Sequence, residues 1–213
     1  MKEIREIGIE KEIFLLDENN EIMEPKLYGF PRDEFEFLVE LRSLPSDRLY
    51  PVYTTLQQEE LQYRLRANKF GMHLEDKPNM YKSNDWIDNH WNKYNLYRFD
   101  DCDYTENIYG NKGESHHFGV LDDTFEGIER KRLTAGIHVH FSSRDSITGE
   151  VIDLPIEKIV KKMDKQFHWT IKEAERNRGE WEPKTHGFEY RSLPSNVNML
   201  RVLKCAFKIL REI

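Results

Sequence analysis

The chain has 213 residues, of which 33% are charged and 38% are hydrophobic, and its net charge is −7. A chain of this length can bury the core of one large domain, and its composition is that of a polar globular protein. The negative charge argues against a general nucleic-acid-binding protein, which needs a basic surface. It is compatible with carboxylates gathered to hold a metal.

The remaining bulk features predict a soluble cytoplasmic protein. No segment approaches the roughly 20 apolar residues of a membrane-spanning helix. Charged residues interrupt the N-terminal segment, which therefore does not resemble a signal peptide. The two cysteines, Cys102 and Cys205, are too few for a disulfide scaffold, and we expect them to be reduced thiols.

Residues 3–16 are expected to form the first strand. Apolar residues recur there at every second position, so Glu10 and Glu12 share one face. Lys11 should lie among the apolar residues of the opposite face. A turn at residues 17–21 follows this strand.

Residues 34–44 alternate in the same way and predict a second strand, which Pro45 ends. A helix is expected over about residues 51–69, ended by Gly71. Residues 72–130 follow no clear period, and we interpret them as a partly helical insertion over the site. Glu36, Glu40 and Arg42 share one face of the second strand. Ser46 or Asp47 can cap the helix that follows it.

The segment RLTAGIHVHFSS (residues 132–143) predicts a third strand from its alternation and its β-branched residues. His138 and His140 share one face, and the opposite face is apolar. Residues 154–171 carry apolar side chains at helical spacing and predict a helix. Residues 176–187 are expected to form a loop.

A nearly identical heptapeptide occurs twice, as ELRSLPS at residues 40–46 and EYRSLPS at residues 189–195. In each copy the Glu and the Arg share one strand face, the Pro ends the strand, and the Ser can cap a helix. The second copy predicts a last strand and a helix over about residues 197–211, capped by Ser195 or Asn196. A strand-to-helix corner explains SLPS but not the preceding Glu-x-Arg. We therefore predict that both copies deliver a Glu and an Arg to the same site.

Four expected strands thus carry polar residues at alternate positions, which are Glu10, Glu12, Glu40, Arg42, His138, His140, Glu189 and Arg191. Any one pair is typical of the solvent face of an amphipathic strand. In one antiparallel sheet, however, the carboxylates would repel one another unless cations were bound among them. Oxygen ligands with one or two nitrogens favour Mg²⁺ or Mn²⁺ over zinc. The neighbouring arginines suit phosphate.

This combination predicts phosphoryl transfer from a metal-bound nucleotide. The sequence contains no P-loop, and no Gly-x-Gly-x-x-Gly follows a strand. P-loop, kinase-loop and Rossmann sites are therefore excluded.

Four segments, GIEKEIFLLDENNEIMEP, VELRSLP, RLTAGIHVHFS and KTHGFEYRSLPSN, resemble in this order the motifs of the phage-type carboxylate–amine ligases (amidoligases). That family belongs to the glutamine synthetase and glutamate–cysteine ligase superfamily. The resemblance spans nearly the whole chain except residues 72–130. It implies one catalytic domain over residues 1–213 with an α+β fold, in which a curved antiparallel sheet forms a funnel-like half-barrel and helices pack on its outer face.

The resemblance also implies an activity, namely ATP-dependent joining of a carboxylate to an amine through an acyl phosphate, with two Mg²⁺ (or Mn²⁺) ions. The substrates would be small molecules or peptides in the cytoplasm of a bacterial or phage-infected cell, with no nucleic-acid or membrane partner. Glu12 and Glu40 would bind one ion, and Glu10 would bind the other together with His138 and Glu189. The remaining implied residues are the phosphate-contacting catalytic pair Arg191 and Arg42, and the nucleotide-binding Arg178, Lys184 and His140.

Two other classes stay open. A metal-dependent hydrolase could use the same His and Glu ligands to activate water, although it would not need the arginines. A catalytically silent relative could bind nucleotide or metal without turnover, because fold does not determine function. Metal-dependent binding of ATP distinguishes the ligase from the hydrolase.

Overall fold

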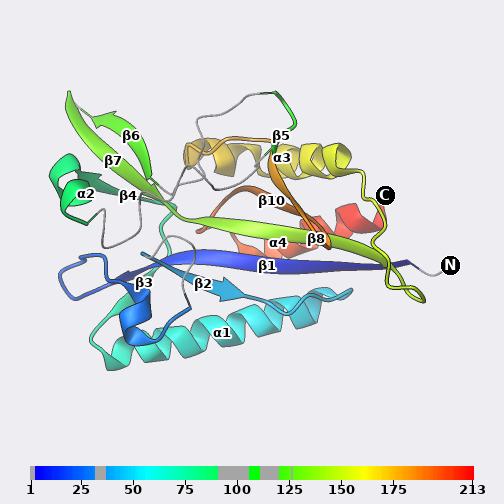
Figure 1. Ribbon diagram of the computed structural model, residues 1–213, viewed down its shortest axis with the longest axis horizontal. Coiled ribbons are helices and arrows are strands. Elements are labelled where there is room, and N and C mark those ends of the chain that lie inside the picture. Colours follow the sequence, from blue (N-terminus) through cyan, green and yellow to red (C-terminus); the bar gives the residue numbers. More distant parts are fainter. Residues whose placement is uncertain (1–2, 32–36, 91–105, 111–119, 126) are drawn as a thin grey trace.

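The computed structural model describes residues 3–31, 37–90, 106–110, 120–125 and 127–213 (Figure 1). Two long strands, β1 (Glu3–Leu16) and β8 (Gly136–Asp145), run side by side and antiparallel through its middle. They are the centre of a sheet with the strand order β2-β1-β8-β10-β9-β5, in which β3 also pairs with β1. The other strands are β2 (Leu38–Arg42), β3 (His73–Glu75), β5 (Glu106–Asn107), β9 (Glu180–Lys184) and β10 (Gly187–Pro194).

The fold is therefore α+β, with an antiparallel sheet that does not close on itself. This much of the expected fold is confirmed. One face of the sheet is covered by three helices, α1 (Leu49–Lys69), α3 (Ile156–Glu173) and α4 (Met199–Arg211).

The helix-covered face holds the main hydrophobic core. Alternate residues of the central strands, such as Ile9 and Val139, are almost completely buried there against apolar side chains of the three helices. Burying one such side chain contributes about 1.5–3 kcal/mol. Tyr190 also lies on this face, and its hydroxyl donates a hydrogen bond of 2.8 Å to the buried Asp164 of α3. Lys11 faces the same side, as expected, and its Nζ lies 2.7 Å from Oδ2 of Asp76.

The opposite face is polar at its centre and apolar at one end. Phe14 and Leu16 of β1 pack there with Leu38 and Leu133 in a second, smaller core. A three-stranded sheet, β4-β7-β6, and helix α2 lie at this end, away from the two chain termini (Figure 1). Their bounds, with those of the short 3₁₀ helix η1, are β4 (Asn79–Ser83), β6 (Val120–Phe125), β7 (Ile128–Thr134), α2 (Asn84–His90) and η1 (Pro25–Tyr28).

The two copies of the heptapeptide occupy equivalent places on either side of the central pair. Across β1 and β2, Glu12 faces Glu40, and across β8 and β10, His140 faces Glu189. The Ser that ends each copy is hydrogen-bonded at an equivalent place. Ser46 forms a bridge with Ile7 of β1, and the Ser195 amide donates to the carbonyl of Ala135, just before β8, at 3.1 Å. The equivalent registers relate the two halves of the sheet by an approximate twofold axis.

Two of the expected elements are wrong. The strand expected over residues 132–143 is split at Ala135, because the residues before it pair in the small sheet and those after it pair in the main sheet. The loop expected over residues 176–187 contains β9, whose Trp181 packs edge-on against Phe188 with ring centroids 6.2 Å apart.

The expected helix caps are also wrong. Helix α1 begins after Arg48, which makes no side-chain capping bond. Ser46 lies two residues earlier, where its backbone is still hydrogen-bonded to Ile7 of β1. Helix α4 is capped by Asn198, whose side chain accepts a hydrogen bond from the Arg201 amide at 2.9 Å. Ser195 is fully buried, lies three residues before this cap, and donates its amide hydrogen to the Ala135 carbonyl between β7 and β8.

The composition predicted that the chain has no membrane-spanning helix and that its cysteines are reduced thiols. Among the described residues, no helix has both the length and the apolar character needed to cross a membrane. Cys205 is a free thiol, and burial raises its pKa to about 11. Cys102 lies outside the described residues.

Gly187, at the start of β10, should not tolerate a side chain. Its φ of +148° lies in the region that favours glycine, and an added Cβ would lie 2.1 Å from the Phe141 carbonyl oxygen. We expect Gly187→Ala to destabilise the fold by more than about 2 kcal/mol, measured by urea unfolding, because backbone would have to move. Gly8→Ala is the control, since its Cβ would meet His140 Cβ at an ordinary 3.7 Å. Equal stability of the two variants would contradict this prediction.

Candidate metal and phosphate site

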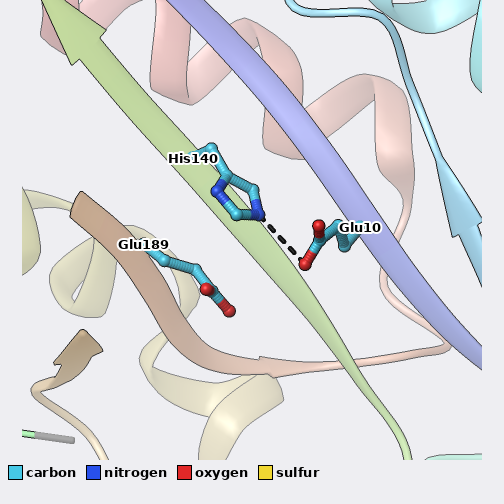
Figure 2. Close-up of side chains that lie close together, drawn as sticks. All are labelled: Glu10, His140 and Glu189. Carbon is cyan, nitrogen blue, oxygen red and sulfur yellow. Dashed lines mark ion pairs between the residues drawn. The ribbon is translucent and has the colours of Figure 1, made fainter. Parts of the chain in front are cut away.

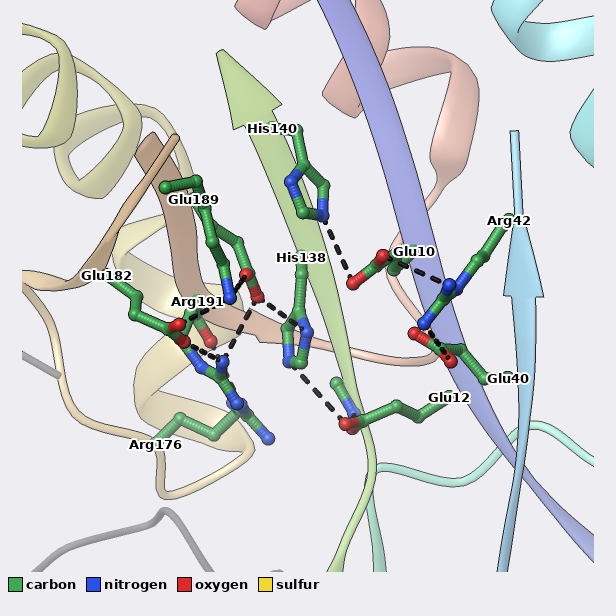
Figure 3. A network of polar contacts seen from close by, with 12 residues as sticks. Glu10, Glu12, Glu40, Arg42, His138, His140, Arg176, Glu182, Glu189 and Arg191 are labelled. Carbon is green, nitrogen blue, oxygen red and sulfur yellow. Dashed lines mark hydrogen bonds and ion pairs between the residues drawn. The ribbon is translucent and has the colours of Figure 1, made fainter. Parts of the chain in front are cut away.

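The polar face of the main sheet gathers ionisable side chains from five neighbouring strands (Figure 3). They come together because each lies at alternate positions of its strand, on the side away from the helices. We call this group the sheet cluster, and in strand order it consists of Arg42 and Glu40 of β2, Glu10 and Glu12 of β1, His138 and His140 of β8, Glu189 and Arg191 of β10, and Glu182 and Lys184 of β9.

Three members of the cluster, Glu10, His140 and Glu189, form a triad whose side chains point toward one another (Figure 2). Their ligand atoms all lie within 4.8 Å of one another. Nε2 of His140 is 3.1 Å from Oε2 of Glu10. Two carboxylates and one imidazole at this spacing are a donor set that a divalent cation can use.

His138 lies deeper in the cluster and joins its two halves. Its Nδ1 is 2.8 Å from Oε1 of Glu189, and its Nε2 is 3.6 Å from Oε1 of Glu12. Glu12 also accepts a hydrogen bond from the amide of Gly136. Although burial and then Arg191 disfavour the imidazolium, the carboxylates of Glu12 and Glu189 raise the pKa of His138.

Cationic side chains flank the carboxylates at both edges of the cluster. At one edge, Nη2 of Arg42 lies 2.7 Å from Oε2 of Glu40, and Nε lies 3.4 Å from Oε1 of Glu10. At the other edge, Nη1 of Arg191 lies 2.6 Å from Glu182 and 3.2 Å from Glu189.

The pKa values of Glu10, Glu189 and Glu40 show how burial and neighbouring charges compete in the cluster. Burial disfavours the charged form of Glu10, but the contact with His140 and the charges of both histidines hold its pKa at about 2. Burial likewise opposes ionisation of Glu189, yet His138 and then Arg191 hold its pKa well below the usual value. At Glu40, burial outweighs Arg42, and the nearby carboxylates help to raise its pKa to about 7.

Two buried atoms of the triad support the fit of a cation. Nε2 of His140 and Oε1 of Glu189 make no well-directed hydrogen bond within the part of the chain that the structure describes. Both nevertheless lie at ion-pair distance from charged neighbours. Buried polar atoms without a directed partner are available to a metal ion. A cation would also reduce the repulsion between the neighbouring carboxylates, which adds to burial in raising the pKa of Glu40.

The structure brings most of the expected site residues together. All five expected metal ligands, Glu10, Glu12, Glu40, His138 and Glu189, belong to the sheet cluster, together with Arg42, Arg191, Lys184 and His140. In the triad, His140 stands beside Glu10 and Glu189, where the family resemblance implies His138. Arg178 lies elsewhere, against Tyr109 and His168, so a contact with the nucleotide stays a prediction for it. Glu36 lies outside the described residues.

Two residues of the site were not predicted from sequence. Glu182 of β9 bonds Arg191, and the alternation of charged residues at Glu180, Glu182 and Lys184 could have revealed this strand. Arg176 donates hydrogen bonds to the carbonyls of Arg191, at 2.9 Å, and Ala135, at 3.4 Å. No sequence pattern marks Arg176, because its place depends on how the loop after α3 crosses the sheet.

A groove of about 630 Å³ opens beside the triad, and its lining includes Glu10, Arg42, His140, Arg144 and His186. Nδ1 of His140 is 3.3 Å from Nε2 of His186. The triad is therefore accessible from a cleft that offers both acidic and basic groups to a substrate.

The chain was compared with known proteins. It matches no protein-family model, and neither the curated proteins nor the solved structures include one that is significantly similar to it. The likeness to the carboxylate–amine ligases thus stays a prediction from the four sequence segments.

Metal binding is expected to stabilise the fold. Mn²⁺ or Mg²⁺ should raise the melting temperature of the wild-type protein, because a ligand that binds only the native state adds about 2.7 kcal/mol at 100 times its Kd. Glu10→Gln and Glu189→Gln should each abolish most of this shift, since each removes a ligand charge while preserving volume. Glu157→Gln, on the exposed side of α3, is the control and should keep the full shift. A shift of wild-type size in both cluster variants would exclude the triad as the site.

Proposed function

We propose that the chain is an ATP-dependent carboxylate–amine ligase that forms an amide or peptide bond through an acyl phosphate. The observation that carries the proposal is the sheet cluster, in which a Glu-His-Glu triad shares Glu189 with one Glu-x-Arg pair and lies next to the other pair on the same polar face. In the proposed fold, the unclosed sheet corresponds to the half-barrel of the glutamine synthetase and glutamate–cysteine ligase superfamily.

Two divalent cations, Mg²⁺ or Mn²⁺, would fit the available donors. Glu10 and Glu189, with an imidazole of His140 or His138, would hold one of them. Glu12 and Glu40, which face each other across β1 and β2, would hold the other. When bound, the ions would neutralise charge on the β- and γ-phosphates of ATP.

The arginines would bind the phosphoryl group during its transfer. Arg191 is held by Glu182 and Glu189, with 23% of its side chain exposed, so its guanidinium is partly oriented before substrate binds. Arg42 is more exposed and reaches Glu40 and Glu10 from the opposite edge. Planar guanidinium groups fixed in this way can stabilise the charge that develops on phosphate oxygens.

The reaction has two steps. The substrate carboxylate attacks the γ-phosphorus of ATP and ADP leaves, which gives the acyl phosphate. The amine then attacks the acyl carbonyl, phosphate leaves, and the nitrogen loses a proton. The cleft beside the triad provides acidic and basic groups where the carboxylate and the amine could bind.

A metal-dependent hydrolase is the second candidate, because the triad requires no nucleotide to hold a metal ion and opens on a groove. The two arginines count against it, since metal-activated water needs no paired phosphate ligands. Nucleotide binding separates the two functions.

Titration calorimetry with a non-hydrolysable ATP analogue tests the proposal. The wild-type protein should bind the analogue with Mg²⁺ and bind it far more weakly in EDTA. Glu10→Ala and Glu189→Ala should lose the Mg²⁺-dependent binding while their circular dichroism spectra remain those of a folded protein. The exposed Glu157→Ala is the matched control and should bind normally. No binding by the wild-type protein with Mg²⁺ would exclude the ligase and leave the hydrolase.

A further inference from the structure

The exposed side of α3 carries five lysines. On the other side of the helix, Val160, Met163 and Ile171 are buried in the main core. Because residues three and four positions apart share one side of a helix, the lysines between these apolar positions point away from the sheet. They are Lys158, Lys161, Lys162, Lys165 and Lys172.

Helix α4 has the same one-sided charge. Val202, Ala206 and Leu210 are buried against the core, and the helix contains no acidic residue. All of its basic residues are exposed to solvent, and they are Arg201, Lys204, Lys208 and Arg211.

The basic residues of the two helices form one continuous surface, which we call the basic face. The helices pack against each other, and Nη2 of Arg201 donates to the Gln166 carbonyl of α3 at 3.1 Å. Glu212, just after α4, lies between the two rows of cations. Its Oε2 is 2.7 Å from Nζ of Lys162, and its Oε1 is 3.9 Å from Nζ of Lys208. The two rows therefore share a single carboxylate.

Positive charge is in surplus on the basic face. Glu157 pairs with Lys161, and Glu212 pairs with Lys162 and Lys208. Among the described residues, no carboxylate lies at ion-pair distance from the other cations of the face. The net charge of the whole chain is −7, so the basic face is the positive side of a polarised molecule and does not reflect a basic composition. Such a surface favours an anionic partner.

A large aromatic residue stands among these lysines. Trp169 lies one turn after Lys165 on the exposed side of α3, and 68% of its surface is accessible. Nζ of Lys172 is 5.5 Å from the centroid of its ring. Tryptophan is enriched where proteins meet the head groups of a bilayer, because its ring is apolar and its indole N–H is polar.

We propose that the basic face docks the protein on a membrane surface that contains anionic lipids. All five cations of α3 and two of the four on α4 are lysines, which act as mobile point charges. Such a set suits a plane of anionic head groups, where each cation adds attraction without a fixed geometry. Nucleic acid matches less well, because directional phosphate recognition favours arginine. The acidic remainder of the chain would also repel a polyanion that extends beyond this face.

Docking through the basic face would leave the sheet cluster accessible. The helices cover one face of the main sheet, and the cluster lies on the opposite face (Figures 1 and 3). The groove beside the triad would therefore open toward solvent. This inference does not depend on the proposed ligase activity, because no residue of the cluster belongs to the basic face. It departs from the resemblance to the ligases, which implies no membrane partner.

Co-sedimentation of the full chain with phospholipid vesicles tests the proposal. The protein should bind vesicles made of equal parts of phosphatidylglycerol and phosphatidylcholine in about 0.1 M salt, and about 1 M salt should release it, because salt screens the charges. Lys158→Gln, Lys165→Gln and Lys204→Gln should each weaken binding about fivefold, the contribution of one cation near an anionic surface. Lys26→Gln, at an exposed lysine of η1, removes the same charge elsewhere and should bind like the wild type.

Binding to the mixed vesicles without binding to pure phosphatidylcholine supports the proposal. It is overturned if the protein does not distinguish the two kinds of vesicle, or if the triple lysine variant, folded by circular dichroism, binds like the wild type. An equal loss in Lys26→Gln would also overturn it, since net charge alone would then explain the binding. A parallel titration with a fluorescent DNA duplex tests the other polyanion. If the duplex binds more tightly than the vesicles through the same lysines, the basic face is a nucleic-acid surface and the membrane proposal is wrong.

Discussion

The antiparallel pairing of β1 with β8, with Glu10 opposite His138, is the constraint on which the rest of the site depends. Because side chains alternate along a strand, this register puts the glutamates of β1 and the histidines of β8 on one face and their apolar neighbours on the other. A slip of one residue in either strand would bring Ile9 and Lys11, or Val139, onto the polar face and break the core beneath α1, α3 and α4. The hydrophobic core therefore fixes the geometry of the polar cluster.

The two faces of the sheet differ in how their charged side chains are paired. On the helix side, the single buried charge of β1, Lys11, is matched by Asp76 and Glu60. On the polar side, five carboxylates lie close to arginine, lysine and histidine side chains, and burial, together with the neighbouring carboxylates, raises the pKa of Glu40 to about 7. Crowded carboxylates are costly unless a ligand uses them. This cost is the physical reason for reading the cluster as a metal and phosphate site rather than as a solvated surface.

The two halves of the sheet differ at their outer edges, where the approximate twofold relation ends. The half around β10 continues into β9, which adds Glu182 and Lys184, whereas among the described residues the strand order ends at β2 on the other side. Arg176 donates hydrogen bonds to the carbonyls of Arg191 and Ala135 on the β10 side. Arg191 is consequently more enclosed than Arg42, with 23% against 65% of its side chain exposed. The two equivalent motifs thus hold arginines that are both ion-paired with carboxylates of the cluster but differ in exposure.

Sequence alone predicted four of the five strands of the polar face and most of the residues on them, because a period of two is a local property that Glu10, Glu12, His138 and His140 display directly. The doubled heptapeptide likewise pointed to one shared site. Only the tertiary structure decided which histidine stands in the triad, since that depends on the register between β8 and β10. It also decided the break at Ala135, the strand β9 and the place of Arg176 and Arg178, because each results from pairing or packing between segments far apart in the chain.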